Sequence, residues 1–174
     1  MSSPATLIMR YKKIKTLVEQ VVQPSIDFIK SSRDRTTMPF KEIEAILNVF
    51  FPRTKHADSK HGFFKHVFII HSASRRLVLK IGRSKRDIQR DYVTYTRLCD
   101  RANPKRANEH FAKIYWRTGL FMLQKYGKEV AVPPKEHKRL KEFGERFGLK
   151  DVKEANIMKF GNKFKIIDAE RKKR

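Results

Sequence analysis

The sequence LKDVKEANIMKFGNKFKIIDAE, residues 149–170, decides how the fold of this chain is interpreted. Asp151 is followed five residues later by Asn156, after which two short apolar runs flank the turn FGN at residues 160–162. Such runs around a glycine-containing turn predict a β-hairpin, which would fold Asp168 back towards Asn156. Carboxylate and amide oxygens are ligands that Mg²⁺ takes in proteins. These three polar residues therefore form either a metal-and-phosphate site or part of an ordinary surface.

Two more hairpins and two helices are predicted upstream of this stretch. The strand pairs are VFII with RLVLKI (67–70 and 76–81) and HFAKIYWR with LFMLQKY (110–117 and 120–126). Between the pairs, residues 84–99 carry apolar side chains on one helical face, with Ser84 in the N-cap position. Residues 100–109 are expected to form a loop, and Pro133-Pro134 is expected to open a helix.

The N-terminal part of the chain is expected to be helical. One stripe of apolar side chains recurs at steps of four and three, namely Leu7, Tyr11, Ile14, Val18 and Val21. Pro24 is expected to break or kink this helix. Residues 31–38 indicate a linker, a second helix lies between Pro39 and Pro52, and residues 52–62 indicate a loop. Helices followed by strand pairs that alternate with single helices predict an α+β fold.

The composition bounds the partners and the compartment. The 174 residues contain 41 Lys and Arg against 18 Asp and Glu, a net charge of +23. Such an excess favours a polyanionic partner, with nucleic acid before an anionic membrane surface, unless it reflects a basic proteome. One cysteine, Cys99, fits a reducing interior. No apolar run reaches the roughly 20 residues that span a bilayer, so we expect a cytoplasmic protein without a transmembrane segment.

The polar residues of the first stretch suit phosphoryl transfer. That reaction needs a cation on the phosphates, a divalent ion held by oxygen ligands, and a carboxylate near the attacking hydroxyl. Asp151 could supply the carboxylate, and Asn156 and Asp168 the oxygen ligands. Lys80 ends the apolar strand RLVLK and could supply the cation.

These residues resemble the motifs of the protein-kinase-like superfamily over residues 60–170. Asp151 to Asn156 is similar to the family's Asp-x-x-x-x-Asn catalytic loop, Asp168 to its metal-binding aspartate, and Lys80 to its strand lysine. The acid that pairs with that lysine looks most like Asp91, with Asp87 as the spare candidate. FMLQKYG is similar to the fifth strand and hinge, where the backbone of Leu123, Gln124 and Tyr126 would meet adenine.

The resemblance implies a minimal kinase-like fold that binds ATP and Mg²⁺. Residues 1–55 would be a helical extension and 56–174 the kinase-like domain, with a sheet lobe at about 60–130 and a reduced catalytic lobe at about 131–174. Asp151 would be catalytic, Asn156 and Asp168 would hold the metal, and the cofactor-binding residues would be Lys80, Asp91, Gly62, Leu123, Gln124 and Tyr126.

The chain departs from the family pattern at three places. Leu149 stands where the loop histidine is expected, and the phosphate flap near SKHGFFKH contains only Gly62, where Lys60 or Lys65 would compensate by charge. Only four residues follow Asp168-Ala169-Glu170, so an acceptor would be held by the N-terminal helices, by a second subunit (a partner chain or a second copy of this chain), or by nothing.

Other polar residues carry less information. His56, His61, His66 and His71 recur every five residues, a step that gathers them on no single face and predicts scattered surface histidines. Basic and aromatic residues also mix in KHGFFKH and AKIYWR, as they do in nucleic-acid binders, although core packing suits these rings better. The leading interpretation is an ATP-dependent phosphotransferase with an unknown acceptor. The alternative is a catalytically degenerate kinase-fold module, a pseudokinase, that binds nucleic acid or a nucleoprotein through its basic surface.

Overall fold

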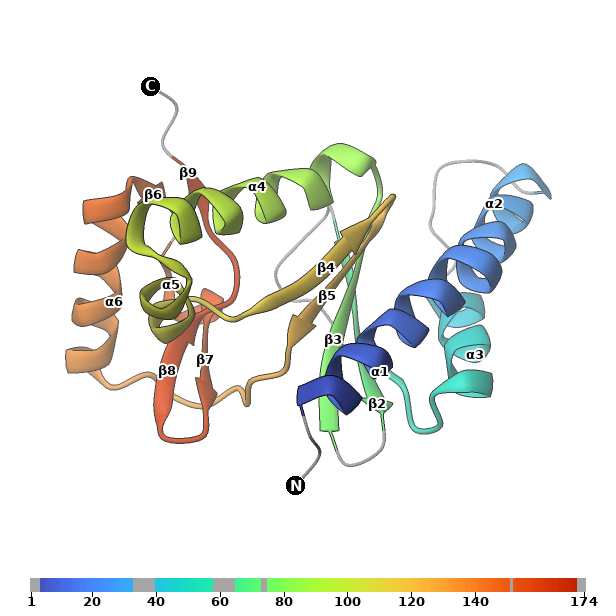
Figure 1. The fold of residues 1–174 in the computed structure, drawn as a ribbon, viewed down its shortest axis with the longest axis horizontal. Coiled ribbons are helices and arrows are strands. Elements are labelled where there is room, and N and C mark those ends of the chain that lie inside the picture. Colours follow the sequence, from blue (N-terminus) through green and yellow to red (C-terminus); the bar gives the residue numbers. More distant parts are fainter. Residues whose placement is uncertain (1–3, 33–39, 58–64, 73–74, 151, 172–174) are drawn as a thin grey trace.

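The computed structural model describes residues 4–32, 40–57, 65–72, 75–150 and 152–171. It is an α+β structure built on a five-stranded sheet in which every pairing is antiparallel (Figure 1). The strand order is β1-β2-β3-β5-β4, with bounds Lys55–Ala57, Lys65–Ser72, Arg75–Gly82, Phe121–Lys125 and Ile114–Thr118. The α+β class expected from the sequence is therefore confirmed.

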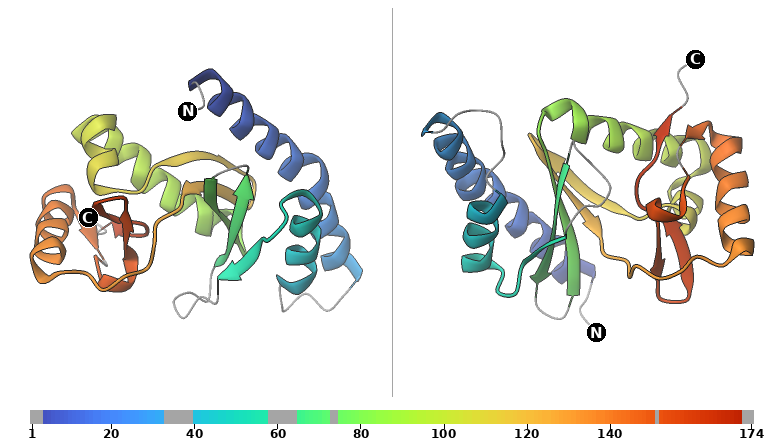
Figure 2. Two further views of the ribbon diagram at one scale, coloured as in Figure 1. Left: turned by 90° about the horizontal axis from the view of Figure 1, so that it is seen from below. Right: turned by 180° about the vertical axis from the view of Figure 1, so that it is seen from behind.

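Helices from the N-terminal part cover one face of this sheet (Figure 2). They are α1 (Pro4–Leu17), the π-helical turn η1 (Val18–Val22), α2 (Gln23–Ser32) and α3 (Phe40–Phe50). Ile14, Val18 and Leu47 pack with Phe68, Leu79 and Leu123 of the sheet in one apolar core. The Trp116 indole N–H also donates to the Tyr11 carbonyl at 3.1 Å, which ties β4 to α1. The helices and the sheet thus bury their apolar surfaces against each other.

Pro24 does not end the first helix. The Gln23 N–H donates to the Val18 carbonyl, five residues earlier, and this wider turn runs directly into α2. Proline lacks an N–H and its ring crowds the carbonyl four residues before it, so a local π-helical turn accommodates it without breaking the helix.

The other face of the sheet carries α4 (Lys85–Ala102) and the C-terminal elements. These are α5 (Pro104–His110), α6 (Pro134–Phe147), η2 (Glu154–Asn156), the hairpin of β7 (Ile157–Phe160) and β8 (Lys163–Ile166), and the short pair β6 (Leu149–Lys150) and β9 (Glu170–Arg171). Ile88 and Leu98 of α4 share a second apolar core with Leu140, Phe164 and other residues of these elements.

Two predicted loops contain regular structure. The predicted loop at residues 100–109 is wrong, because α4 extends to Ala102 and α5 begins at Pro104. The Asn103 side chain accepts a hydrogen bond from the Arg106 N–H at 2.9 Å, an N-cap that restarts the helix with proline in its first turn. The predicted loop at 52–62 likewise contains β1, which pairs with β2. Tertiary pairing stabilises β1, a strand too short to show a pattern of its own.

The expectation of scattered histidines is wrong for two of them. His56 on β1 and His66 on β2 come together, with His56 Nε2 and His66 Nδ1 3.3 Å apart. The Phe40 ring of α3 stacks on His56 with the ring centroids 4.8 Å apart. Pairing of β1 with β2 brings together residues that lie ten apart in the sequence, which no periodicity within one element reveals.

None of the helices in the described residues is long and apolar enough to span a membrane.

Candidate functional site

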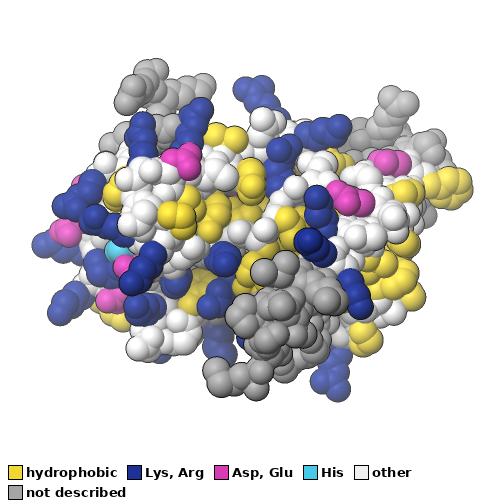
Figure 3. All heavy atoms as spheres, in the orientation of Figure 1, with side chains coloured by type: hydrophobic (Ala, Val, Ile, Leu, Met, Phe, Trp, Pro, Cys, Tyr) yellow, Lys and Arg dark blue, Asp and Glu magenta, His cyan; other side chains and the backbone are white. Residues whose placement is uncertain are grey.

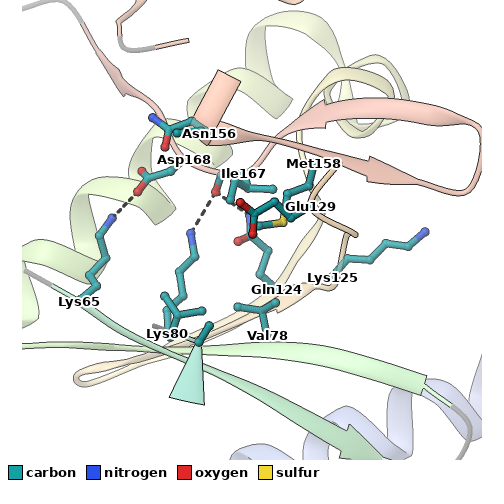
Figure 4. Close-up of a pocket in the computed structure, with 13 residues that line it drawn as sticks. Lys65, Val78, Lys80, Gln124, Lys125, Glu129, Asn156, Met158, Ile167 and Asp168 are labelled. Atoms are coloured by element: carbon teal, nitrogen blue, oxygen red, sulfur yellow. Dashed lines mark hydrogen bonds and ion pairs between the residues drawn. The ribbon is translucent and has the colours of Figure 1, made fainter. Parts of the chain in front are cut away.

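A pocket lies between the sheet and the C-terminal elements, on the face opposite α1–α3 (Figure 4). Its volume is about 160 Å³. β2, β3 and β5 form one wall, while η2, β7 and the segment after β8 form the other. The lining side chains are Ala57, Lys65, Val67, Val78, Lys80, Gln124, Lys125, Glu129, Ala155, Asn156, Met158, Ile167 and Asp168.

The alternation of strand residues places the polar groups in this pocket. Leu77, Leu79 and Ile81 of β3 belong to the core under the N-terminal helices, whereas Val78 and Lys80 line the pocket. Side chains on a strand alternate between faces, so neighbours such as Leu79 and Lys80 have opposite surroundings. The register repeats this pattern across the sheet, because Lys80 lies opposite Val67 on β2 and Val78 lies opposite Gln124 on β5.

Lys80 is almost fully buried and its ammonium group faces the second wall. Nζ donates to the Ile167 carbonyl at 3.0 Å and lies 3.8 Å from Asp91 Oδ2. Burial lowers the pKa of Lys80, and the nearby carboxylates of Asp168 and Asp91 only partly counter this effect. An ammonium group has three N–H donors, so an anion entering the pocket could accept a bond from it.

Helix α4 places Asp91 beside Lys80. The helix begins after Ser84, whose backbone N–H donates to the Asp87 carboxylate at 2.9 Å. Asp87 therefore caps its own helix, while Asp91, one turn later, is the acid beside Lys80. The buried face of α4 includes Ile88, Asp91 and Tyr95, so packing of the apolar residues directs the Asp91 carboxylate inward.

Lys65 forms an ion pair with each of the two carboxylates. Its Nζ lies 2.6 Å from Asp91 Oδ2. The same Nζ is 3.0 Å from Asp168 Oδ2 (Figure 4). Burial alone would lower the pKa of Lys65, but the two carboxylates outweigh burial and raise it. Lys65 and Lys80 thus share a small buried volume with Asp91 and Asp168, which balances two positive charges against two negative ones. Buried charges need such partners because desolvation penalises each one by several kcal/mol.

The two carboxylates respond in opposite directions to this environment. Burial and the charge of Asp168 raise the pKa of Asp91. For Asp168, burial acts in the same direction, but Lys80 and Lys65 outweigh it and lower the pKa of that carboxyl. Asp168 is also the more exposed of the pair, with 30% of its side chain accessible against 4% for Asp91. Asp168 is therefore an ionised carboxylate with access to the pocket.

Asn156 and Asp168 come from neighbouring segments of the second wall. The Ile167 N–H donates to the Asn156 carbonyl at 2.8 Å, and this bond holds η2 beside the segment that follows β8. Both side chains line the pocket. The predicted hairpin brings them together as the sequence indicated, since β7 and β8 pair in register from Ile157 with Ile166 to Phe160 with Lys163.

The segment after β5 closes one side of the pocket. Leu123 is fully buried in the core on the helical face, and the adjacent Gln124 donates from Nε2 to the carbonyls of Ala112 and Ile167. The Lys125 side chain points away from the pocket (Figure 4), and Tyr126 is not among the lining residues but lies under the Arg76 guanidinium. Gly127 passes so close to β7 that an added Cβ would lie 2.6 Å from the Phe160 ring.

Two predicted site residues, Asp151 and Gly62, lie outside the described residues, as does Lys60. The structure brings together Lys80, Asp91, Asn156 and Asp168, whose link was predicted from their order along the chain. Gln124 joins them through its side chain, while Leu123 and Tyr126 can contribute only through their backbone.

Other lining residues were not singled out from the sequence. Lys65 was considered only as a phosphate counter-charge, and its contacts with Asp91 and Asp168 depend on the pairing of β2 with β3. Val78 could have been found, because it stands two residues before Lys80 on the same face of the strand. Met158, Ile167 and Glu129 become lining residues only through the packing of the hairpin against the sheet.

Comparison with protein-family models and with curated proteins found no match to this chain.

Proposed function

We propose that this chain binds ATP with Mg²⁺ in the described pocket and transfers the terminal phosphoryl group to a hydroxyl acceptor, as a minimal protein-kinase-like phosphotransferase. One observation carries the proposal. Lys80, Asn156 and Asp168 come from three separate segments and line one largely apolar pocket, and Asp91 of α4 lies 3.8 Å from Lys80 Nζ. Phosphoryl transfer is catalysed mainly by positioning and by charge, which such a constellation supplies.

The apolar part of the pocket suits a planar base. Val67 and Val78 lie on the sheet wall, and Met158 and Ile167 on the opposite wall. Ligand sites commonly combine such apolar walls with a few polar groups that fix orientation. The backbone after Gln124 would hydrogen-bond the base edge, and the Glu129 carboxylate at the pocket's border would accept bonds from ribose hydroxyls.

The oxygen donors of the second wall fit a magnesium ion. Mg²⁺ uses few protein ligands and keeps water and phosphate oxygens in its shell, so the Asn156 amide and the Asp168 carboxylate suffice. When bound, the ion would neutralise charge on the phosphates. Asp168 Oδ2 is already 3.0 Å from the Lys65 ammonium, so Lys65 and Mg²⁺ would compete for the charge of this carboxylate. Lys65 would keep its shorter contact with Asp91.

Each remaining group would have one role in the transfer. Lys80 would donate to the non-transferred phosphates, and Asp91 with Lys65 would hold charge balance around it. Asp151 would orient the acceptor hydroxyl and take its proton. The acceptor oxygen would then bond to the terminal phosphorus while the bond from that phosphorus to the bridging oxygen breaks, so that ADP leaves.

The acceptor would approach from a side that α1–α3 do not occupy. These helices cover the sheet face opposite Lys80, so they lie behind the pocket and not at its entrance. A partner chain or a second copy of this chain would be one way to cover an acceptor. A kinase-like protein that binds nucleotide without transfer would need no acceptor at all.

Calorimetric titration with ATP, with and without Mg²⁺, tests the proposal. Asp168→Asn should abolish the Mg²⁺-dependent part of binding, and Lys80→Met should weaken ATP binding by about ten- to a hundredfold, the worth of a charge-assisted hydrogen bond. Lys85→Met removes an exposed lysine outside the pocket and serves as the matched control.

Wild-type protein that binds no ATP would refute the proposal, and so would equal affinities for the wild type and Lys80→Met. If ATP binds but no ADP forms with hydroxyl acceptors, the result would support the nucleotide site and refute the proposed transferase activity. The protein would then match the non-catalytic alternative.

A further inference from the structure

Six lysines gather on three segments that touch one another beside the pocket. The segments are the stretch between α5 and β4, the end of β5 with its connection to α6, and the β7–β8 hairpin. We call this group the hinge lysine cluster, and its members are Lys113, Lys125, Lys128, Lys159, Lys163 and Lys165.

Backbone hydrogen bonds place four of these lysines opposite one another in two pairs, Lys113 with Lys125 and Lys128 with Lys159. The Lys125 N–H donates to the Lys113 carbonyl at 2.9 Å. Lys128 and Lys159 exchange both of their backbone bonds, at 2.8 and 2.9 Å, as an isolated antiparallel bridge. Like charges directly opposite on paired strands destabilise the pairing. The chain nevertheless places lysine at all four positions.

The two lysines of β8 add to the same charge. Lys165 is half-buried and its ammonium donates to the Asn108 carbonyl of α5. Burial lowers the pKa of Lys165, and the positive charges of Lys125 and Lys163 lower it further, which places these side chains close together.

Carboxylates do little to neutralise the cluster. Glu109 is close enough to counter part of the shift in the pKa of Lys165, and Glu129 follows Lys128 along the chain. Among the described residues, however, none of the six lysines forms an ion pair with a carboxylate. Lysines at rigid strand positions, without counter-ions, are prepared to meet an external polyanion.

We propose that the hinge lysine cluster binds the phosphodiester backbone of a nucleic acid. This inference goes beyond the proposed nucleotide site and does not depend on it. Paired strands hold the backbone of these lysines in fixed register, with Lys163 and Lys165 on one face of the hairpin and Lys159 on the other. Their side chains therefore present positive charge around the hairpin to successive phosphates.

The distribution of apolar surface favours nucleic acid over a membrane. Membrane-surface helices combine a basic face with apolar side chains that enter the lipid. Among the described residues, four of the exposed large apolar side chains lie on α2 and α3, across the sheet from the cluster, and the fifth, Val130, lies on the connection from β5 to α6. The four are Phe28, Phe40, Val49 and Phe50. Lys and Arg side chains instead gather over the half formed by α5, α6 and the hairpin (Figure 3).

The test measures binding of a fluorescently labelled single-stranded RNA by anisotropy across a series of salt concentrations, with single-stranded DNA of the same sequence in parallel. The variant is Lys113→Glu with Lys159→Glu and Lys163→Glu, three exposed residues that do not line the pocket. The matched control is Lys12→Glu with Lys13→Glu and Lys41→Glu, exposed residues on the helical side with the same change in net charge.

We expect wild-type affinity to fall steeply with salt and the cluster variant to bind at least about tenfold more weakly than the control. Its plot of log affinity against log salt should be shallower by about two units, since each phosphate contact on a single strand contributes about 0.7. A triple Lys→Gln variant at the same positions repeats the test without charge reversal, should the Glu variant fail to fold.

Equal weakening in the cluster variant and the control would overturn the inference, because it would assign binding to diffuse charge. No RNA or DNA binding by the wild type would also overturn it, as would binding only to vesicles of anionic phospholipid. Preference between the RNA and the DNA would identify the source of the phosphodiester. The cluster variant should bind ATP like the wild type, so failure of this inference and failure of the nucleotide site are distinguishable.

Discussion

The two faces of the central sheet bury different kinds of side chain from the same strands. The face under α1–α3 presents Phe68, Leu79 and Leu123 to an apolar core. The opposite face presents Lys80 and Gln124 to a pocket. Both faces are well buried at these positions, so burial alone does not distinguish the part of the molecule that holds the fold together from the part suited to chemistry.

The difference lies in what each buried side chain requires. An apolar side chain gains stability from any well-packed neighbour, by roughly 25 cal/mol for each Å² removed from water. Lys80 and Asp91 lose their contacts with water on burial. Their described partners in the fold are each other, Lys65 and the Ile167 carbonyl. A chain that keeps such a costly arrangement in an otherwise apolar interior is expected to use it.

The largest expected effect compares two neighbouring residues of β3. Leu79→Ala should lower the free energy of unfolding by about 2–5 kcal/mol, because it opens a cavity in the core under the helices. Lys80→Met should lower it by less than Leu79→Ala does, because methionine fills the space, burial already disfavours the charged form of Lys80, and Asp91 keeps Lys65 at 2.6 Å. Urea denaturation followed by circular dichroism measures both values. Comparable losses of unfolding free energy in the two variants would show that the pocket side of the sheet stabilises the fold as much as the helical side does.

A smaller effect is expected for Mg²⁺ binding in the pocket. If the proposed site binds ATP, Lys65→Gln should lower the Mg²⁺ concentration for half-maximal binding by about tenfold, since the Lys65 charge no longer competes with Mg²⁺ for the Asp168 carboxylate. Calorimetry at a series of Mg²⁺ concentrations measures it, with Lys85→Gln as the control. A higher Mg²⁺ requirement, or weaker ATP binding at saturating Mg²⁺, would instead assign Lys65 to the phosphates.

The smallest effect concerns the histidine pair on the helical face. Burial, His56 and Arg83 lower the pKa of His66 from its ordinary value of 6.5. The unfolded chain therefore takes up a proton at a higher pH than the folded chain, so stability falls as pH drops from about 6.5 towards the lowered pKa. His66→Gln should flatten this part of a melting-temperature profile, while His71→Gln should not. The pKa of His110 is also lowered, so some dependence will remain. An unchanged profile in His66→Gln would exclude the pair as its source.

Much of the architecture could be predicted from local patterns. The hairpin around Gly161, the helix after Ser84 and the helix after Pro133 follow from periodicity, capping and turn residues. Helix α5 and strand β1 could not be predicted, because Asn103 restarts a helix within a polar segment and β1 exists only through pairing with β2. The continuation past Pro24 depends on a single π-helical turn that no propensity signals.

The candidate site divides in the same way. Lys80, Asn156 and Asp168 were proposed as site residues from residue type and their places at the ends of predicted strands, and Asp91 from the resemblance to kinase motifs. The sequence did not predict the contacts of Lys65 or the apolar wall of Met158 and Ile167. Nor did it predict which lysines pair beside the pocket. Each of these depends on which segments meet.

By itself the sequence determined the α+β class, the order of most elements and the excess of positive charge. Those properties depend on side-chain type and on spacing along one segment, which can be examined without knowing any neighbour. Only the tertiary structure decided which face of the sheet the helices cover, which cation meets Asp168, and which lysines lie opposite one another. These are contacts between segments distant in sequence, and their energies exist only once the chain has folded.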